Sequence, residues 1–436
     1  MSQDILAQEK AATEPISTPS VTNTPKAATY DIAERQKLID ATEVPTFGWQ
    51  ADLYSDVQIL NNALRKLNID HRIDGPKPSK NEQLLRMYKL LNHIAKTTQR
   101  IICVINSKGG AGKTPVATGL AATMQWSIKT ICGIIDANEN NGTTGKRLGI
   151  SRDGLLLLRG AMANLDAISN LNKMSMRLGK HDQTGLIALL SDPSATNDRF
   201  TLEQFTKLAN VFFGNVHSGV LDTGNGNEHP ANEGSFQFAD VALFSAWAPK
   251  ADSFEGLVSS MDAYYKLGYE EKVRSSYIVI SATSKKDTKD KFYKMLENLV
   301  GELVEDEPGS TINRDQKMKE LGITHDNMFL IPFSEYIQGG ITDTAVPAVD
   351  MDPRVTGVDT LIAFAELALA IFLREVPSRD ENQKFNDTLN AKKDLESASF
   401  SLEERKRWAI QELVELSGSP QAAGMDIFLA FPDKKE

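Results

Sequence analysis

A glycine-rich segment, Lys108–Thr114, constrains the fold of this chain more than any other stretch. It follows the apolar run Ile101–Asn106, which predicts a buried strand, and it precedes a run of residues that predicts a helix. Glycines at 109, 110 and 112 let backbone N–H groups curve around an anion, because no Cβ stands in the way. A strand, a glycine-rich loop, Gly-Lys-Thr and a helix, in that order, are typical of a phosphate-binding loop.

Two side chains at the end of this segment have distinct predicted roles. Lys113 supplies a positive charge for the β- and γ-phosphates of a nucleotide, and the Thr114 hydroxyl is positioned to bind Mg²⁺. The backbone that we expect to surround the phosphates is Gly109, Gly110, Ala111, Gly112, Lys113 and Thr114.

The chain around this loop alternates apolar runs with helical patterns from about residue 100 to 375. Continuous apolar strands with helical crossovers predict an α/β fold, a mostly parallel twisted sheet with helices on both faces. The predicted strands are Ile101–Asn106, Thr130–Asp136, Leu186–Leu190, Ser218–Asp222, Val241–Ala246, Tyr277–Ser281 and Met328–Pro332.

Both ends of the chain differ from this middle part. Residues 1–45 have little periodicity and predict a disordered tail, and residues 46–98 predict a helical extension of two helices. The second of these opens with a capping box at Ser79 and Glu82. We favour packing of the extension on the main domain, residues 99–376, over a free partner-binding arm. Residues 377–436 predict a linker and a C-terminal helix that begins at Ser401.

Composition narrows the class of protein. The 436 residues have a net charge of -10, which argues against a wholly basic nucleic-acid binder while leaving room for a local basic face. The two cysteines, Cys103 and Cys132, lie in apolar strands and predict buried thiols, which excludes an iron–sulfur cluster. We expect no signal peptide and no apolar run of about 18 residues that spans a bilayer, hence a cytoplasmic protein.

The loop differs from the common phosphate-binding pattern, because Ser107 replaces its first glycine and Lys108 precedes Gly109-Gly110. This Lys-Gly-Gly-x-Gly-Lys-Thr form resembles the deviant Walker A loop of the ParA and MinD family of ATPases. The resemblance implies ATP and Mg²⁺ as cofactors, and a homodimer that forms on ATP binding. It also implies that Lys108 reaches the partner subunit's phosphates, where a lysine neutralises excess negative charge.

About 270 residues resemble this family in order. In the segment after the second strand, Asp136 matches the family's first Asp, and Asn138 stands where a second Asp orients the attacking water. Asp222 ends a strand as the Walker B residue does, so we expect Thr114, Asp222 and Asp136 to bind the metal. The ends of two later strands match positions that contact adenine in the family, and Pro332 is the residue that we assign there. Together, the segments Asp136–Asn138, Asp222–Ala231 and Ile331–Gly340 are most similar to an actinobacterial MinD-like subgroup, which includes partition ATPases and ATPases encoded beside secretion systems.

Two departures from the family pattern lower the expected rate and affinity. Asn138 cannot accept a proton as a carboxylate does, although its amide oxygen can still orient water and Glu139 is an alternative. Pro115 lacks the N–H that relatives direct at the α-phosphate, so we expect it to weaken nucleotide binding. The predicted catalytic residues are Lys108, Lys113, Asp136 and Asn138, and we expect slow basal hydrolysis that a partner stimulates.

Three functions remain open from the sequence. In the first, an ATP-bound dimer binds DNA nonspecifically and positions a plasmid or chromosome through a ParB-like or other adaptor protein, which would bring the protein to the nucleoid. In the second, the chain is a secretion-associated regulatory ATPase, and in the third an ATP-binding scaffold with negligible hydrolysis. A basic cluster is a candidate DNA-binding face or, alternatively, a solvated helix face: Lys285, Lys286, Lys289, Lys291 and Lys294.

Overall fold

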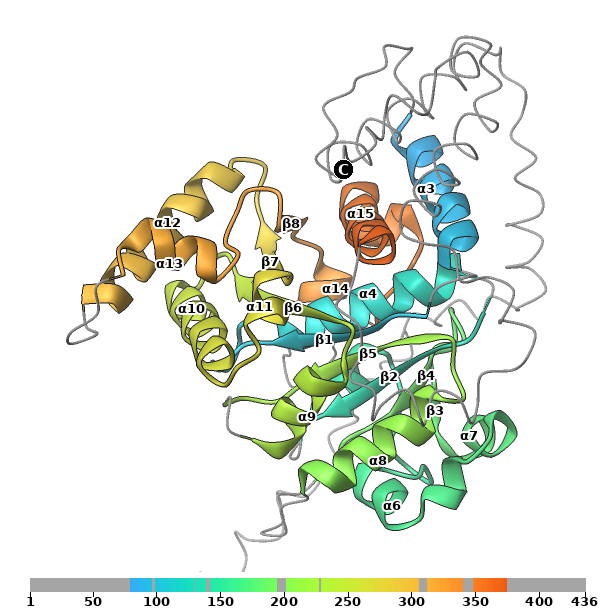
Figure 1. The fold of residues 1–436 in the computed structure, drawn as a ribbon. Helices are drawn as coiled ribbons and strands as arrows, with labels where there is room; N and C mark the ends of the chain where they lie inside the picture. The colour runs from blue at the N-terminus through green and yellow to red at the C-terminus, as the bar shows by residue number, and fades with distance from the viewer. Residues whose placement is uncertain are drawn as a thin grey trace, which may run out of the picture.

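The structure is a computed structural model that describes residues 79–95, 99–128, 130–138, 142–193, 201–226, 229–305, 312–339 and 348–374. Within these residues the chain forms an eight-stranded sheet in the order β3-β4-β2-β5-β1-β6-β7-β8, with helices on both faces (Figure 1). All pairings are parallel except that of β3 with β4. The predicted α/β fold class is confirmed.

The strands begin and end close to their predicted bounds. They are β1 (Ile101–Ile105), β2 (Cys132–Ala137), β3 (Gly179–Lys180), β4 (Ile187–Leu189), β5 (Ser218–Thr223), β6 (Val241–Trp247), β7 (Tyr277–Thr283) and β8 (Met328–Pro332). Among the described strands the prediction missed β3, because a two-residue antiparallel strand at a sheet edge is too short to leave a hydrophobic pattern.

Alternate residues of each central strand contribute to separate hydrophobic cores on the two faces of the sheet. In β1, Ile102 and Val104 belong to one core, whereas Ile101, Cys103 and Ile105 belong to the other. Both sets are buried because helices cover both faces. This two-sided burial explains why the strands are continuous apolar runs instead of alternating ones.

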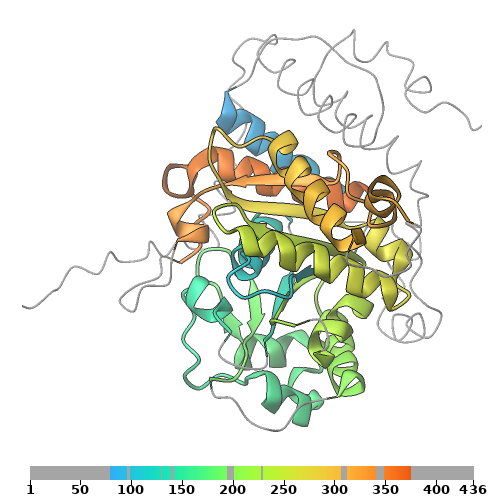
Figure 2. The same ribbon diagram turned by 90° about the vertical axis from the view of Figure 1, so that its left-hand side faces the viewer.

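The helices divide between the two faces. One core is covered by α3 (Lys80–Ala95), α4 (Lys113–Ser127), α14 (Glu335–Gln338) and α15 (Val358–Leu373). The other is covered by α6 (Leu158–Ala163), α7 (Leu171–Arg177), α8 (Leu202–Phe213), α9 (Pro230–Phe238), α10 (Ala251–Lys266), α11 (Glu270–Arg274), α12 (Lys289–Glu305) and α13 (Arg314–Glu320). Figure 2 shows α10 and α12 side by side. A short helix, α5 (Thr144–Arg147), follows β2.

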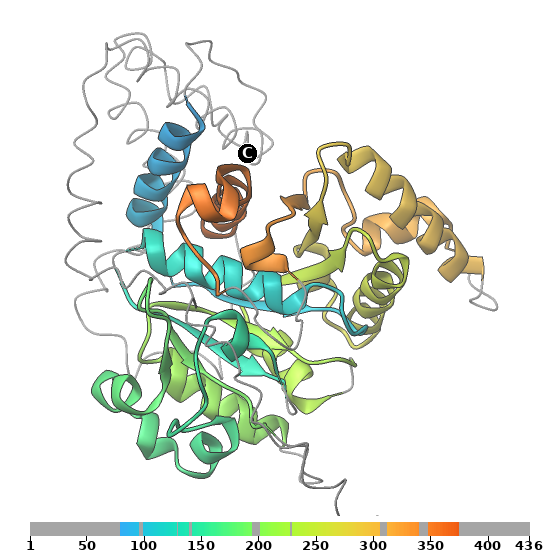
Figure 3. The ribbon, with the colours of Figure 1, turned by 180° about the vertical axis from the view of Figure 1, so that it is seen from behind.

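Helix α3 begins at the predicted capping box and packs on the main domain. The Ser79 backbone N–H donates to Glu82 Oε2 at 2.9 Å, and the Glu82 N–H donates back to Ser79 Oγ at 3.3 Å. Leu84, Met87 and Leu91 are buried in the same core as α15, beside which α3 lies (Figure 3). The expectation that this part of the extension packs on the main domain is therefore confirmed for α3.

The segment Pro353–Leu373 is long and apolar enough, by length and composition, to cross a membrane. The sequence expectation missed it because Asp359 and Glu366 interrupt the apolar run. In the structure 67% of its most apolar stretch of 18 residues is buried, and α15 packs on α3, α4 and β8. This packing is typical of a core helix, which is apolar on all sides because protein surrounds it.

Several predictions concern residues outside the described part of the chain. These are the tail at residues 1–45, the first helix of the extension, Glu139, and the linker and helix at residues 377–436. The division into four segments stays a prediction. Both cysteines are described and lie buried in β1 and β2, as expected, and burial raises the pKa of the Cys103 thiol to about 12.

Candidate functional site

The glycine-rich loop connects β1 to α4 at the carboxyl end of a central strand. Gly110 and Gly112 have φ values of 71° and 80°, in the left-handed region that favours glycine. A Cβ at Gly112 would lie 2.5 Å from Ser281 Oγ and 3.1 Å from the Trp247 ring. The loop therefore requires glycine both for its backbone conformation and for its close approach to β6 and β7.

Hydrogen bonds from the neighbouring β6 and α10 hold the start of the loop. The Asn106 side chain donates to the Ser245 carbonyl at 2.6 Å and to the Ser253 carbonyl at 2.8 Å. Its amide oxygen accepts from the Lys108 N–H at 2.8 Å. The Ser107 N–H donates to Ser260 Oγ at 2.9 Å. This end of the loop is fixed by the fold, as a preorganised binding site requires.

Lys113 is buried beneath the loop, with 6% of its surface exposed. Its ammonium donates to the Lys108 carbonyl at 3.1 Å and to Asn225 Oδ1 at 2.9 Å. Burial lowers the pKa of Lys113 to about 8, while the charge of Asp222 opposes this shift. An anion bound at the loop would favour the charged form of this lysine, as expected of a phosphate ligand.

Asp222, near the end of β5, is fully buried and faces two threonines. Its Oδ2 accepts from the Thr144 hydroxyl at 2.7 Å, and the Thr114 side chain also lowers the pKa of this carboxyl. Its Oδ1 has no hydrogen-bond partner among the described residues. Burial raises the pKa of Asp222, whereas the two hydroxyls and the Lys113 charge lower it. A buried carboxylate oxygen without a partner is the kind of group that a cation or its water shell satisfies.

Asp136 lies beside Asp222, because β2 and β5 pair in parallel with these two residues in register. Its Oδ2 accepts from the Ser191 hydroxyl at 2.9 Å, and its Oδ1 accepts from the Asn138 N–H at 3.3 Å. Burial and then the nearby charge of Asp222 raise the pKa of Asp136. A Cβ at Gly142 would lie 2.0 Å from Asp136 Oδ2, so glycine is required there.

The segment after β5 links the loop to α9. Asn225 accepts from Lys113, and the Gly224 N–H donates to Asn232 Oδ1 of α9 at 3.0 Å. Asn138 borders the same segment, since a Cβ at Gly224 would lie 2.8 Å from Asn138 Oδ1. A change at the Lys113 ammonium can therefore reach α9 through one asparagine.

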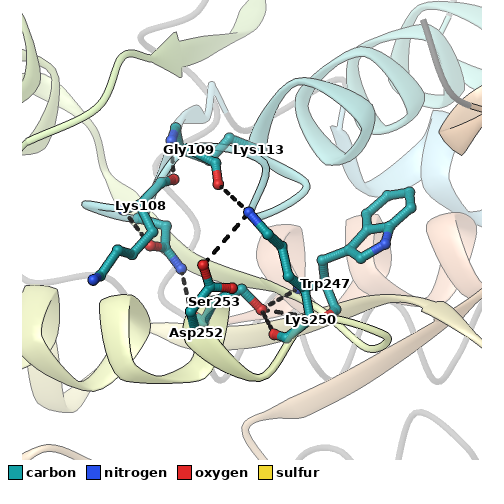
Figure 4. A network of polar contacts seen from close by, with 8 residues as sticks. Lys108, Gly109, Lys113, Trp247, Lys250, Asp252 and Ser253 are labelled. Carbon is teal, nitrogen blue, oxygen red and sulfur yellow. Dashed lines mark hydrogen bonds and ion pairs between the residues drawn. The ribbon is translucent and has the colours of Figure 1, made fainter.

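The structure brings some predicted site residues together and leaves others apart. Lys113, Thr114, Asp136 and Asp222 meet at the carboxyl ends of three adjacent strands, and Pro115 is buried in the first turn of α4. Lys108 is exposed, and its side chain extends away from the Lys113 ammonium (Figure 4). Pro332 ends β8, which is three strands from β1 in the sheet order.

The predicted basic cluster begins after β7 and continues into α12. Lys291 is paired with Asp287 at 2.6 Å, and Lys289 donates to the His325 carbonyl at 2.7 Å. The remaining members are exposed: Lys285, Lys286 and Lys294. The pairing of Lys291 with Asp287 reduces the charge available for an external anion, whereas the carbonyl that holds Lys289 is neutral.

Sequence reasoning missed several residues that shape the site. Thr144 and Asn225 lie in segments that resemble the family, but neither residue was assigned a role, and Ser191 follows β4 outside any motif. Lys250, in the turn between β6 and α10, donates to the Gly109 carbonyl at 2.9 Å (Figure 4). A lysine within an Ala-Pro-Lys turn gives no sequence signal, because its position over the loop depends on how β6 lies beside β1.

No cluster of three or more His, Cys, Asp or Glu side chains that could hold a metal ion occurs in the described residues. Mg²⁺ bound with a nucleotide does not need one, because it uses one or two carboxylates, a hydroxyl, water and phosphate oxygens. The Thr114 hydroxyl and the Asp222 carboxylate fit this pattern. The geometry can therefore hold a phosphate chain at the loop together with a hard divalent cation.

Several solved structures have folds similar to this chain. The ParA family ATPase from Chlorobium tepidum TLS is 14% identical, with 62% of this chain and 98% of that chain covered and a TM-score of 0.42. McdA of Cyanthece in its apo form is 12% identical, with 62% and 100% covered and a TM-score of 0.44. The septum site-determining protein MinD from Pyrococcus horikoshii OT3, complexed with Mg-ADP, is 17% identical, with 62% and 95% covered and a TM-score of 0.39.

No protein-family model matches this chain, and no curated protein matches its sequence. At the identities found, the likeness to solved structures concerns the fold alone. The chemistry of the site therefore rests on the residues described above.

Proposed function

We propose that this chain binds Mg²⁺-ATP at the loop Lys108–Thr114 and hydrolyses it slowly, as a dimerisation switch. The observation that carries the proposal is the meeting of Lys113, Thr114 and Asp222 at the carboxyl end of the sheet, with Asp222 Oδ1 buried and without a hydrogen-bond partner in the described residues. A cation beside that oxygen satisfies it, and phosphates at the loop satisfy the Lys113 charge.

The residues present fit both groups. The backbone N–H groups from Gly109 to Thr114 and the start of α4 would hold the phosphates, and Thr114 and Asp222 would hold the metal. When bound, Mg²⁺ neutralises charge that develops on the phosphate oxygens. The buried Asp136, beside Asp222 in register, adds a second negative charge on the metal side.

Lys113 connects nucleotide binding to the rest of the fold. To reach a phosphate it exchanges its contacts with the Lys108 carbonyl and Asn225. When Lys113 leaves Asn225, the segment after β5 that contains Gly224 and Asn225 can change its conformation. Asn232 of α9 is hydrogen-bonded to this segment. The same lysine that binds phosphate therefore controls a segment on the surface of the site, as a switch requires.

Hydrolysis would be slow because the residue beside the site is Asn138, which orients water but cannot act as a base. Its amide oxygen lies next to Gly224, on the segment that Lys113 controls. We propose that a partner accelerates this step by ordering that segment. Such stimulation is typical of an ATPase that uses hydrolysis to change the proteins that it binds.

Lys108 and the exposed lysines support the partition variant of this switch. Lys108 is exposed at the loop, where it can reach a second subunit, and the exposed lysines beside α12 can bind DNA phosphates. In this variant an adaptor such as a ParB-like protein stimulates hydrolysis, and the protein lies in the cytoplasm on the nucleoid. The alternatives are a secretion-associated regulatory ATPase and a scaffold that binds ATP without hydrolysis.

The test uses the full chain. We expect Mg²⁺-dependent ATP binding by calorimetry, a dimer with ATP but not ADP by light scattering, and turnover below about 10 s⁻¹, the median for enzymes. Lys108→Ala should bind ATP and remain monomeric. Absence of ATP binding by the wild-type chain would refute the proposal.

A second measurement separates the alternatives. Salt-sensitive DNA binding that requires ATP supports partition, and its loss in a Lys285→Ala/Lys286→Ala variant locates the surface. Dimerisation without DNA binding supports the regulatory ATPase. ATP binding without phosphate release, even with a stimulating partner present, supports the scaffold.

A further inference from the structure

Lys250 is a lysine outside the phosphate-loop motif whose ammonium nevertheless contacts the loop. Its Nζ donates to the Gly109 carbonyl at 2.9 Å and lies 3.5 Å from Asp252 Oδ2 (Figure 4). It also lies 3.1 Å from the position of a Cβ at Gly110. The side chain is 45% exposed, so it has room to move between partners.

The turn that carries Lys250 is fixed against the loop. The Lys250 N–H donates to the Trp247 carbonyl at 2.9 Å, and Ser253 Oγ donates to the Lys250 carbonyl at 2.6 Å. The Trp247 ring lies 3.1 Å from the position of a Cβ at Gly112. The backbone of Lys250 therefore keeps its place beside the loop, and the flexible part is its side chain alone.

Lys250 contacts the start of the loop at Gly109, next to the carbonyl that the Lys113 ammonium contacts. Thr114 and the start of α4 mark the other end of the loop. The Lys113 ammonium, which serves the β- and γ-phosphates in such loops, points back to the carbonyl of Lys108. Lys250 holds the next carbonyl along, that of Gly109. The two ammonium groups therefore flank the γ-phosphate end of the loop.

We propose that Lys250 is a specificity-determining residue that favours a nucleoside triphosphate over a diphosphate. The ammonium exchanges the Gly109 carbonyl, a neutral acceptor, for an oxygen of the terminal phosphate, a charged one. Charge-assisted hydrogen bonds are the stronger kind, which favours the exchange. A diphosphate lacks this oxygen, and Lys250 then stays on the loop and on Asp252. This inference rests on the proposed nucleotide site.

The experiment compares ATP and ADP affinity in the full-length chain by calorimetry with Mg²⁺ present. Lys250→Ala should weaken ATP binding about tenfold, the loss of one charge-assisted hydrogen bond, and change ADP binding less than about twofold. Lys250→Arg should restore most of the ATP affinity. Lys207→Ala is the matched control, because Lys207 is an exposed lysine on α8 with its own acidic partner, Glu203, 2.7 Å away. It should leave both affinities unchanged.

A variant of the acidic partner provides an independent arm. Asp252→Asn removes the competing carboxylate, and ATP binding should tighten about twofold, in line with a half-exposed ion pair. Equal losses for ATP and ADP in Lys250→Ala, or no loss in either, would overturn the inference. Its failure is distinct from failure of the nucleotide site itself, in which the wild-type chain would bind neither nucleotide.

Discussion

Buried charges differ between the carboxyl ends of the central strands β2 and β5 and the outer helices α10 and α13. On the outer helices, Lys317 of α13 is buried and closes an ion pair with Asp262 of α10 at 2.6 Å. At the strand ends, Asp136 and Asp222 lie side by side in register, and Asp222 Oδ1 has no hydrogen-bond partner among the described residues. One region satisfies its charges within the protein, and the other keeps like charges together.

This difference distinguishes a region that stabilises the fold from a region that binds a ligand. Burial and then the charge of Asp222 raise the pKa of Asp136, and two buried like charges destabilise the folded state unless a cation is present. Residues that break the local rules of stability mark functional sites more often than structural ones. Variants at the strand ends should therefore change binding without loss of stability, and variants on the outer helices should do the reverse.

Lys113→Ala should have the largest effect. Loss of about two charge-assisted hydrogen bonds to phosphate, roughly 2 kcal/mol each, lowers ATP affinity about a thousandfold. The folded state should tolerate the change, because burial disfavours the charged ammonium of Lys113 and lowers its pKa to about 8, so that its removal also removes this cost. Calorimetry measures affinity and thermal denaturation measures stability. A large fall in melting temperature with little change in affinity would assign Lys113 to the structural side of the comparison.

Asp222→Asn should separate activity from stability. Removal of the charge that holds the metal should slow Mg²⁺-dependent hydrolysis about a hundredfold. In metal-free buffer the melting temperature should rise, because burial disfavours the ionised Asp222 carboxylate and its charge also raises the pKa of Asp136. Phosphate release measures the rate of hydrolysis, and thermal denaturation with EDTA measures stability without metal. A lower melting temperature would mean that the contacts with Thr144 and Thr114 outweigh the repulsion.

Lys317→Met should show the opposite behaviour. The variant leaves Asp262 with Lys266 as its remaining ionic partner, 2.9 Å away, so we expect about 2 kcal/mol of destabilisation, below the usual loss for a buried pair. ATP affinity should not change. Lys319→Met on the same helix is the control, since Lys319 is exposed. Urea denaturation measures both variants, and equal stability would contradict a structural role for the buried pair.

The sequence predicts the charged half of the site well and its surroundings poorly. Asp136 and Asp222 each end an apolar run, and parallel strands bring their carboxyl ends to one edge, so their meeting follows from the order of the chain. Lys113 and Thr114 follow from the glycine pattern. By contrast, Lys250 and Asn225 reach the loop from turns after β6 and β5, and only the pairing of those strands with β1 places them there.

The same limit applies to the fold. Strand bounds follow from apolar runs with helices between them, whereas β3 is too short to leave a pattern. Helix α15 depends on its neighbours, because apolar residues on all sides fit either a membrane or a protein core. Its packing against α3 decides between these environments, and a contact between residues nearly 280 positions apart has no local sequence signal.

The smallest expected effect concerns the capping boxes of α3 and α8, of which the box at α3 contains a titratable side chain, Glu82. At α3, Ser79 and Glu82 bond reciprocally, and the Ser79 hydroxyl is the main cause that lowers the pKa of Glu82 from its ordinary value of 4.5. At α8, Thr201 and the neutral Gln204 form the same box. Ser79→Ala and Thr201→Ala should each cost about 1 kcal/mol at pH 7.

The two caps should differ in acid. A carboxyl whose folded pKa is lowered contributes stability above its unfolded pKa and loses it as the pH falls through the folded value. The cost of Ser79→Ala should therefore shrink below pH 4.5, as Glu82 becomes protonated, while that of Thr201→Ala stays constant. Urea denaturation at pH 7 and at about pH 3 compares the two variants. Parallel losses at both pH values would show that the serine caps α3 without help from the charge of Glu82.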